Sequence, residues 1–231
     1  MITIICSVYN GEKWLKDYLK TVNCQYLEQF EIVIVDADST DNSVDIVNDH
    51  VFREGITNKL IKLPTRVNIY EAWNTAIKQA RGEYVLNYNV DDRLLPNALS
   101  TYREMIKACP DVDLFYTSWF DCSDEHYSSI SRVHRPPRFS HEALLQNCFI
   151  GPFPLVKRSV FDIVGFFDTD YYISGDYEMW LRMSKHGMKF KSSPCVIGYY
   201  YRNPDGVSTR NTKQRWSDQI EQDTRMRKHY V

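Results

Sequence analysis

Residues 82–92 read Gly-Glu-Tyr-Val-Leu-Asn-Tyr-Asn-Val-Asp-Asp. Residues 84–86 predict a short buried strand, and the polar residues that follow predict its carboxyl end. Ligands of open α/β sheets bind in the crevice beyond the carboxyl ends of the strands. The oxygens of Asp91 and Asp92 at that position suit a hard divalent cation, which also holds substrate phosphates. A solvated turn is the alternative for this pair taken alone, because aspartate is common in turns.

Strands and helices alternate through the first ninety residues. Apolar runs predict the strands, and apolar residues spaced three and four apart predict the helices. In chain order the strands are 2–8, 30–35, 59–63 and 84–86, and the helices between them are 14–22, 44–51 and 70–80. This alternation indicates an α/β fold with a parallel, doubly wound sheet. Polar clusters follow the first, second and fourth strands, so we expect them at one edge of the sheet. Gly82 is expected to end the third helix.

The second half of the chain is less regular. The predicted helices are 95–106, 141–145, 157–164 and 176–186, the predicted strands are 112–120 and 196–201, and 121–139 is either a mobile loop or an irregular hairpin. The charged tail from 209 to 231 has Trp216 and Ile220 as its clearest apolar positions. It is expected to be a helix packed on the body or a frayed end.

Composition narrows the class of protein. The net charge of -2 argues against nucleic acid as the main partner. The six cysteines are scattered, which favours reduced thiols over a disulfide framework or a zinc site. No apolar run approaches the roughly 20 residues that span a bilayer, and the first residues lack the basic leader of a signal sequence. We therefore expect a cytoplasmic protein, with peripheral contact at the inner face of a membrane allowed. The oligomeric state stays open.

Five sets of residues are specific when their order and spacing are taken together. They are Cys6-Ser7-Val8-Tyr9-Asn10-Gly11; Ile34-Val35-Asp36-Ala37-Asp38-Ser39-Thr40-Asp41; Ile69-Tyr70-Glu71-Ala72-Trp73-Asn74 with Ala80-Arg81-Gly82-Glu83-Tyr84; Asn89-Val90-Asp91; and Val164-Gly165-Phe166-Phe167-Asp168 followed by Gly175-Asp176-Tyr177-Glu178-Met179-Trp180-Leu181-Arg182. In this order they resemble the family 2 glycosyltransferases of the GT-A fold. The resemblance covers about residues 1–208.

The resemblance implies a Rossmann-like, mostly parallel sheet with helices on both faces. Residues 1–92 would form the half that binds the nucleotide sugar. Residues 93–208 would form the acceptor-binding and catalytic half of the same domain, and 209–231 the C-terminal tail.

The resemblance also assigns roles to single residues. Asp176 is implied as the catalytic base, with Glu178 structural and Arg182 paired with a carboxylate. Asp91 and Asp92 are implied as ligands of a divalent metal, Mn²⁺ or Mg²⁺. The implied nucleotide-binding residues are Ser7, Tyr9, Asn10, Asp36, Asp38, Arg66, Asn74, Asn89 and Val90.

The sequence departs from the family pattern at four places, of which Asn68, where relatives often carry glycine, is a mild change. Asn89 replaces the first aspartate of the Asp-x-Asp metal motif, which removes one charge and keeps an amide oxygen. Ala37 replaces the second acid of the strand-two motif. Residues 204–206 occupy the loop where relatives often place a histidine that can reach the metal, so the part of this loop in metal binding is open.

The leading hypothesis is a metal-dependent inverting glycosyltransferase. It would move a sugar from a nucleoside diphosphate sugar, with UDP-sugars favoured, to a glycan or a lipid-linked saccharide. A sugar-phosphate nucleotidyltransferase is an alternative, but residues 7–11 contain one glycine where that class needs a glycine-rich phosphate loop. A catalytically silent glycan-binding or scaffold protein of the same fold is the other alternative, and Asn89 is the feature that favours it.

Overall fold

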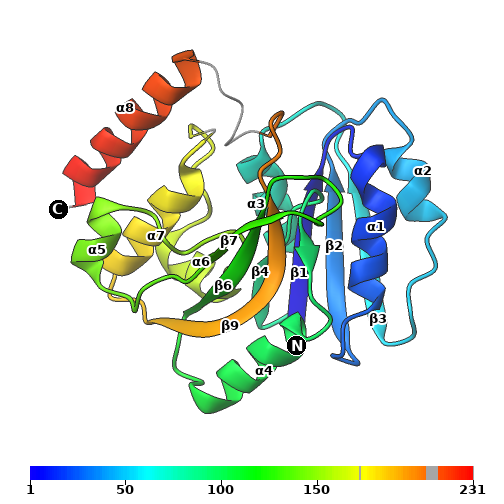
Figure 1. The fold of residues 1–231 in the computed structure, drawn as a ribbon, viewed down its shortest axis with the longest axis horizontal. Helices are drawn as coiled ribbons and strands as arrows, with labels where there is room; N and C mark the ends of the chain where they lie inside the picture. Colours follow the sequence, from blue (N-terminus) through cyan, green and yellow to red (C-terminus); the bar gives the residue numbers. More distant parts are fainter. Residues whose placement is uncertain (172, 207–212, 231) are drawn as a thin grey trace.

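The computed structural model describes residues 1–171, 173–206 and 213–230. Its strands are β1 (Ile2–Val8), β2 (Phe30–Asp36), β3 (Ile56–Lys62), β4 (Tyr84–Asn87), β5 (Arg93–Leu94), β6 (Leu114–Cys122), β7 (Ile130–His134), β8 (Leu155–Lys157) and β9 (Phe190–Tyr201). Its helices are α1 (Glu12–Asn23), α2 (Ser43–Asn48), α3 (Ile69–Gln79), α4 (Ala98–Ala108), α5 (His141–Gln146), α6 (Val160–Val164), α7 (Gly175–Lys185) and α8 (Lys213–Tyr230). Figure 1 shows their arrangement around one curled sheet.

The strands form one sheet in the order β3-β2-β1-β4-β8-β6-β9-β5, and β7 pairs with β6. The first four strands along the chain are parallel, as the alternation of strands and helices predicts. In register, Val8 lies beside Asp36, and Asp36 lies beside Lys62. The carboxyl ends of β1, β2 and β3 therefore meet at one edge of the sheet, which is the edge expected to bind ligands.

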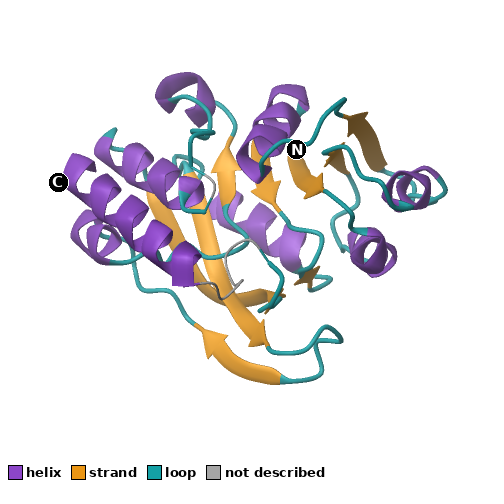
Figure 2. Ribbon diagram, turned by 90° about the horizontal axis from the view of Figure 1, so that it is seen from above, coloured by secondary structure: helices purple, strands orange, loops and turns teal. Residues whose placement is uncertain are grey.

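Helices cover both faces of the sheet (Figure 2). Ile4 of β1 packs in a core with residues of α1, α2 and α4. Its neighbour Ile5 packs in a second core with residues of α3, α5, α6, α7 and α8. Both isoleucines are fully buried, since successive side chains of a strand point to opposite faces. The near-continuous apolar sequence of β1 follows from this burial on both sides.

Gly82 has a different role from the one predicted. The third helix ends at Gln79, and its C-terminal cap is Ala80 in an extended conformation. A Cβ atom at Gly82 would lie 2.5 Å from Thr3 Oγ1 and 2.7 Å from the Thr3 backbone nitrogen. Gly82 is therefore needed for the close approach of the chain to β1, where its N–H donates to Thr3 Oγ1 at 2.9 Å.

The second half differs from the prediction at β8 and at Ile220 of α8, and it confirms the hairpin that was one of the two alternatives for 121–139. Residues 155–157 form strand β8, which pairs antiparallel with β4 and β6, so the predicted helix over 157–164 starts only at Val160. The segment after β6 is a hairpin, because β7 pairs with β6. In α8, Ile220 is 51% exposed, whereas Met226 and Tyr230 are buried against the body.

Two further findings concern the whole described chain. All six cysteines are free thiols. Among residues 1–171, 173–206 and 213–230, no helix has the length and apolar character that crossing a membrane requires.

Candidate active site

Hydrogen bonds join the turn after β1 to the loop after β2. The Asn10 backbone N–H donates to Ser39 Oγ at 2.9 Å, and Asn10 Oδ1 accepts from the Thr40 N–H at 2.8 Å. The Gly11 N–H donates to Ser43 Oγ at 2.8 Å. Asn10 has a φ of 49°, a left-handed conformation that asparagine tolerates better than most residues. The amide of Asn10 thus serves to fix the shape of this edge of the sheet.

Tyr9 and Arg66 meet at the same edge, although the chain separates them by two strands. The Arg66 guanidinium lies 4.1 Å from the centroid of the Tyr9 ring. The tyrosine is 40% exposed, which is unusual for so large a side chain at the end of a buried strand. An exposed aromatic ring backed by a guanidinium is a platform on which a planar base can stack.

Asp36 is the last residue of β2, and only one of its two carboxylate oxygens has a hydrogen-bond partner among the described residues. Its Oδ1 accepts from the Ser39 N–H at 3.1 Å. Its Oδ2 is buried and has no hydrogen-bond partner among the described residues. Buried carboxylate oxygens are normally paired, so this atom is a candidate acceptor for a ligand N–H or O–H. Asp38 is exposed with a φ of 68°, and Ser7 is half-buried on β1 in the same region.

The side chain of Arg93 holds the turn after β4, residues 89–92, through its backbone carbonyls. The Arg93 guanidinium donates to the Val90 carbonyl at 2.9 Å and to the Asp92 carbonyl at 2.6 Å. It also donates to the Trp14 carbonyl at 3.2 Å, which ties the turn to α1. Within the turn, the Asp92 N–H donates to the Asn89 carbonyl at 3.2 Å. The backbone that carries Asn89 and Val90 is therefore fixed by a buried cation, and both residues remain half-exposed.

Asp91 is the half-exposed carboxylate of this turn. Its Oδ2 accepts from Asn203 Nδ2 at 3.2 Å. Partial burial raises the pKa of Asp91, and the hydrogen bond from Asn203 opposes that rise. Asn203 belongs to the loop after β9, where the sequence left the contribution to a metal site open. The loop reaches the site through this amide.

Asp92 is fully buried, in contrast to its neighbour. Its Oδ1 accepts from the Tyr201 N–H at 3.2 Å. Asp92 thus joins the turn at residues 89–92, which we call the metal-motif turn, to the end of β9. Its Oδ2 is buried without a partner among the described residues. Burial first, and then the adjacent charge of Asp91, raise its pKa well above the ordinary value. Both aspartates stay predicted metal ligands: Asp91 is the accessible one, and the unpaired Oδ2 of Asp92 is a buried candidate next to it in the chain.

The residues of this turn fit a magnesium or manganese ion that also holds a diphosphate. Such ions bind through one or two carboxylates and substrate phosphates, and keep several waters. Asp91 would supply the carboxylate, and Asn89 an amide oxygen. The Asn203 amide supports Asp91 instead, because its Nδ2 donates to Asp91 and its Oδ1 accepts from the Asp205 N–H at 3.0 Å. No group of three or more histidine, cysteine, aspartate or glutamate side chains is arranged to hold a metal in the described part of the chain. An all-protein metal cage is therefore not the type of site that these residues form.

Asp176 lies in the first turn of α7, and Tyr70 of α3 positions that turn. The Tyr70 hydroxyl accepts from the Gly175 N–H at 2.9 Å and donates to the Ile173 carbonyl at 2.7 Å. Because α3 begins after β3, its first turn lies at the carboxyl edge of the sheet. Tyr70 thus brings Asp176 to the same edge as Asp36 and Asp91.

The pKa of Asp176 is raised to about 6, mainly by burial of its carboxyl group. Hydrogen bonds from the backbone amides of Asp176 and Tyr177 oppose the rise, and the charge of Asp223 on α8 adds to it. A carboxylate with a pKa near 6 is ionised at neutral pH and still accepts a proton readily. These are the properties of a general base. Tyr172, which precedes this helix in the sequence, lies outside the described residues.

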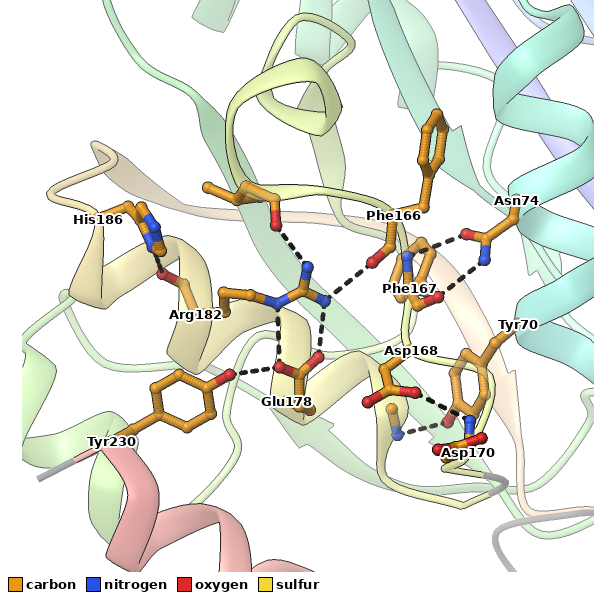
Figure 3. Close-up of polar contacts among 12 residues, drawn as sticks. Tyr70, Asn74, Phe166, Phe167, Asp168, Asp170, Glu178, Arg182, His186 and Tyr230 are labelled. Carbon is orange, nitrogen blue, oxygen red and sulfur yellow. Dashed lines mark hydrogen bonds and ion pairs between the residues drawn. The ribbon is translucent and has the colours of Figure 1, made fainter.

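Glu178 and Arg182 form a largely buried ion pair on α7 (Figure 3). Arg182 Nε and Nη2 donate to the two Glu178 oxygens at 2.9 and 2.7 Å. The guanidinium also donates to the carbonyls of Val164 and Phe166, and the Tyr230 hydroxyl donates to Glu178. The pairing predicted for Arg182 is confirmed, and Glu178 is structural. The network joins α6, α7 and α8.

Asn74, implied as a nucleotide-binding residue, is instead engaged with the backbone of the loop after α6 (Figure 3). Its Nδ2 donates to the Phe167 carbonyl at 2.8 Å, and its Oδ1 accepts from the Phe167 N–H at 3.0 Å. Both ends of this buried amide are therefore used within the fold. We do not retain Asn74 in the proposed nucleotide site.

The comparisons with known proteins agree with this geometry. Residues 3–165 match the family model described as glycosyl transferase family 2. The chain belongs to this family. Its mixed α/β fold with a mostly parallel, curled sheet is the GT-A fold that the resemblance implies.

Two curated relatives of this family 2 chain are similar over most of its length. One is a dolichyl N-acetyl-alpha-D-glucosaminyl phosphate 3-beta-D-2,3-diacetamido-2,3-dideoxy-beta-D-glucuronosyltransferase of Methanococcus voltae, 26% identical over 87% of this chain and 66% of the relative. The other is the UDP-Glc:alpha-D-GlcNAc-diphosphoundecaprenol beta-1,3-glucosyltransferase WfaP of Escherichia coli, 24% identical over 93% of this chain and 82% of the relative.

Solved structures share the fold. TarS of S. aureus, residues 1–349 in complex with UDP-GlcNAc, has a TM-score of 0.75 at 18% identity, over 91% of this chain and 61% of that 1–349 chain. The mannosyltransferase PcManGT of Pyrobaculum calidifontis, in complex with GDP-Man and Mn²⁺, has a TM-score of 0.68 at 20% identity, over 89% and 58%. The family 2 chain thus spans about 60% of the length of these structures, and about two thirds of the M. voltae relative.

Several residues that build the site of this family 2 chain were not predicted. Arg93 and Asn203 act on the metal-motif turn through contacts that no local pattern indicates. Tyr70 was noted only as part of a helix motif, although Gly175 leaves space for its ring: a Cβ atom there would lie 2.8 Å from it. A glycine at the start of a helix is the signal that could have indicated a close neighbour.

Proposed function

We propose that this chain is a metal-dependent inverting glycosyltransferase that uses a nucleoside diphosphate sugar, with a UDP-sugar as the favoured donor. The observation that carries the proposal is that Asp36 and Asp91 follow the carboxyl ends of β2 and β4, and that Tyr70, at the start of α3 on the same edge, holds the turn that contains Asp176. Each acid has a different environment: Asp36 has a buried unpaired oxygen, Asp91 is half-exposed, and the pKa of Asp176 is raised to about 6.

The nucleoside would bind over the ends of β1 and β2. Its base would stack on Tyr9 beside Arg66, and Asp36 Oδ2 would accept a hydrogen bond from the base or the ribose. The exposed carboxylate of Asp38 is available to a ribose hydroxyl. Two similar proteins support uridine as the nucleoside: WfaP is named for the donor UDP-Glc, and TarS has been solved in complex with UDP-GlcNAc.

The diphosphate would lie over the turn after β4. Asp91 would hold the divalent ion there, with Asn89 beside it and Asn203 supporting Asp91. A bound ion of this kind neutralises the leaving diphosphate as a Lewis acid. The complex of PcManGT with GDP-Man and Mn²⁺ supports manganese as the ion to test. Arg93 holds the backbone of the turn in place, so the carboxylate needs little reorganisation when the donor binds.

Asp176 would act on the acceptor. Its carboxylate takes the proton of the acceptor hydroxyl as that oxygen attacks the anomeric carbon. The bond between the anomeric carbon and the diphosphate oxygen breaks, and the nucleoside diphosphate leaves with the electron pair. One displacement with one base inverts the anomeric carbon, as it does in inverting glycosidases. The acceptor hydroxyl and the diphosphate must therefore lie on opposite sides of the sugar ring.

The acceptor class that we propose is a glycan or a lipid-linked saccharide. The two curated relatives carry dolichyl phosphate and diphosphoundecaprenol in the names of their acceptors. Those lipids belong to the relatives, and they define which acceptors should be tried first with this chain.

A second candidate is a catalytically silent, glycan-binding protein of the same fold. Asn89 and the burial of Asp92 favour it, because together they leave Asp91 as the accessible carboxylate of the metal motif. The raised pKa of Asp176 favours the enzyme, since a glycan-binding surface has no need of a partly buried base.

The test is a thermal-shift and donor-hydrolysis screen over a panel of nucleotide sugars, each with manganese and with a chelator. We expect UDP or a UDP-sugar to raise the melting temperature when manganese is present. Ligand at a hundredfold excess over its dissociation constant stabilises the folded state by about 2.7 kcal/mol. A UDP-induced shift that survives the chelator would remove the metal role from Asp91. Binding of the donor without any hydrolysis or transfer would favour the silent protein.

A further inference from the structure

The hairpin between β6 and β7 ends in a compact tip, residues 123–129. The Asp124 carboxylate accepts from the N–H groups of His126, Ser128 and Ser129, at 2.9, 3.2 and 2.5 Å. It also accepts from the Ser128 hydroxyl at 3.1 Å. Four donors on one side chain give the tip a defined shape, in contrast to a mobile loop.

Tyr127 is the residue that this shape presents to the proposed metal site. Its φ is 57°, a left-handed conformation that is unfavourable for a residue with a bulky side chain. In this conformation the Tyr127 hydroxyl donates to the backbone carbonyl of Asp91 at 2.5 Å. Unfavourable backbone conformations persist where surrounding contacts impose them, and they concentrate at functional sites.

The ring of Tyr127 is also held from several sides. The Arg93 guanidinium lies 4.9 Å from the ring centroid. Tyr199 and Tyr201 of β9 meet the ring edge-on, with centroids 6.1 and 6.2 Å away. Arg93 therefore contacts both the metal-motif turn and Tyr127. Through Arg93, the tip and the turn pack together.

The consequence concerns the three successive carbonyls of the metal-motif turn. Arg93 binds the carbonyls of Val90 and Asp92. Tyr127 binds the carbonyl of Asp91, which lies between them. The peptide that carries the proposed metal ligand is thus fixed on both sides and in the middle, and the middle contact comes from the hairpin.

The tip is anchored a second time, across the donor side of the site. Glu125 forms an ion pair with Lys13 of α1, which follows directly after the turn at residues 9–11. Glu125 and Lys13 are partly exposed, so this pair orients the tip more than it stabilises the fold. The hairpin therefore spans from the acceptor-side half of the chain to the nucleotide-side half.

We propose that Tyr127 is a positioning residue for the metal–nucleotide site, acting through the backbone of Asp91, and that the tip at residues 123–129 exists to deliver it. The inference rests on the proposed function, because it needs Asp91 to hold a metal and a diphosphate. It adds a residue from a segment outside every family motif in this sequence.

The test is calorimetry of Mn²⁺ with UDP on the full chain and on Tyr127→Phe. This substitution keeps the ring and its contact with Arg93, and it removes only the hydroxyl group. We expect the affinity for Mn²⁺–UDP to fall about three- to tenfold, the factor that one hydrogen bond commonly represents. The matched control is Tyr116→Phe on β6, whose hydroxyl donates to the Pro137 carbonyl at 2.8 Å. The control should lose similar thermal stability without the ligand and keep the affinity.

A second variant, Asp124→Ala, tests the tip. It keeps the Tyr127 side chain but removes the carboxylate that shapes the tip. We therefore expect the affinity for Mn²⁺–UDP to fall, as in Tyr127→Phe. Equal Mn²⁺–UDP affinity in Tyr127→Phe and the unchanged chain would overturn the inference and leave the proposed function standing. Failure of the unchanged chain to bind Mn²⁺–UDP would overturn the proposed function itself. An equal loss of affinity in Tyr116→Phe would show a general effect of stability and also reject the role of Tyr127.

Discussion

The phenol oxygen of Tyr70 lies 2.9 Å from the backbone nitrogen of Gly175 and accepts its hydrogen bond. The first turn of a helix has N–H groups without intrahelical partners, and side chains of the same segment commonly satisfy them. Here the acceptor comes from α3, far away in the chain. This bond fixes where α7 begins relative to the sheet, and so it fixes where Asp176 lies.

Tyr70→Phe should separate the position of the base from the binding of the donor. Loss of the hydroxyl leaves the Gly175 N–H and the Ile173 carbonyl unpaired, so we expect the free energy of unfolding to fall by about 1–3 kcal/mol. Transfer should slow, and UDP affinity should stay unchanged. The control is Tyr102→Phe, whose buried hydroxyl binds the Phe153 carbonyl on the other face of the sheet. Transfer at the unchanged rate in Tyr70→Phe would mean that Asp176 needs no such support.

The raised pKa of Asp176 predicts a dependence of stability on pH. The pKa of this group in the folded state is about 6, above its ordinary value of 3.8. Between these values the folded state binds more protons than the unfolded state, so stability falls as pH rises through that window. Asp176→Asn should therefore raise the melting temperature at pH 7.5 more than at pH 4. The gain is at most about 3 kcal/mol, at roughly 1.4 kcal/mol for each pKa unit.

The same pKa predicts that transfer slows as pH falls below about 6, because the protonated base cannot accept a proton. Transfer rates measured from about pH 5 to about pH 8, a range that covers the titration of a group with this pKa, check this prediction.

The stability prediction has its own contrary outcome. A melting temperature of Asp176→Asn below that of the unchanged chain at pH 7.5 would show that the carboxylate stabilises the fold, contrary to this account.

Asn89→Asp should tighten metal binding. The position is half-exposed at a polar strand end, so an added charge there costs little folding energy. A second carboxylate beside Asp91 increases the attraction for a divalent ion. Titration of manganese into the two proteins, with and without UDP, measures the difference. An unchanged manganese affinity would place residue 89 outside the coordination shell.

Arg182 should matter for folding and not for donor binding. Arg182→Leu leaves Glu178 charged, buried and without its main partner, which typically costs about 3–5 kcal/mol. The double variant Glu178→Leu with Arg182→Leu should recover part of that loss. Denaturant unfolding checks the stabilities, and calorimetry checks that UDP affinity is retained by the folded fraction. Equal stability of the single and double variants would show that the unpaired charge is not the cause.

Much of the first half follows from the sequence for a simple reason. Its strands and helices are long enough to show their own periods, and parallel strands bring their polar ends to one edge. The sequence alone therefore predicts that the polar residues after β1, β2 and β4 lie at the same edge of the sheet. The second half is different, since β8 has three residues and its apolar sequence reads equally well as the start of a helix.

The contacts that complete the site were beyond prediction because they depend on packing between distant segments. Asn203 meets Asp91, and Tyr201 meets Asp92, across more than a hundred residues of chain. The burial of Asp92 beside the half-exposed Asp91 is likewise a property of β9, which covers one acid and leaves the other open. A sequence pattern assigns the same chemistry to both residues, and only the fold distinguishes them.

The central claim is that Asp91 and Asp176 have separate tasks, donor binding and proton transfer. The measurement that tests it most directly is UDP affinity by calorimetry with manganese, paired with the rate of donor hydrolysis or transfer, in Asp176→Asn and Asp91→Asn. Asp176→Asn should keep its UDP affinity and lose about 10²–10⁴-fold in rate, the usual range for a general base. Asp91→Asn should lose both affinity and rate. Full activity of Asp176→Asn would contradict the account, and loss of UDP binding in that variant would move Asp176 into the nucleotide site.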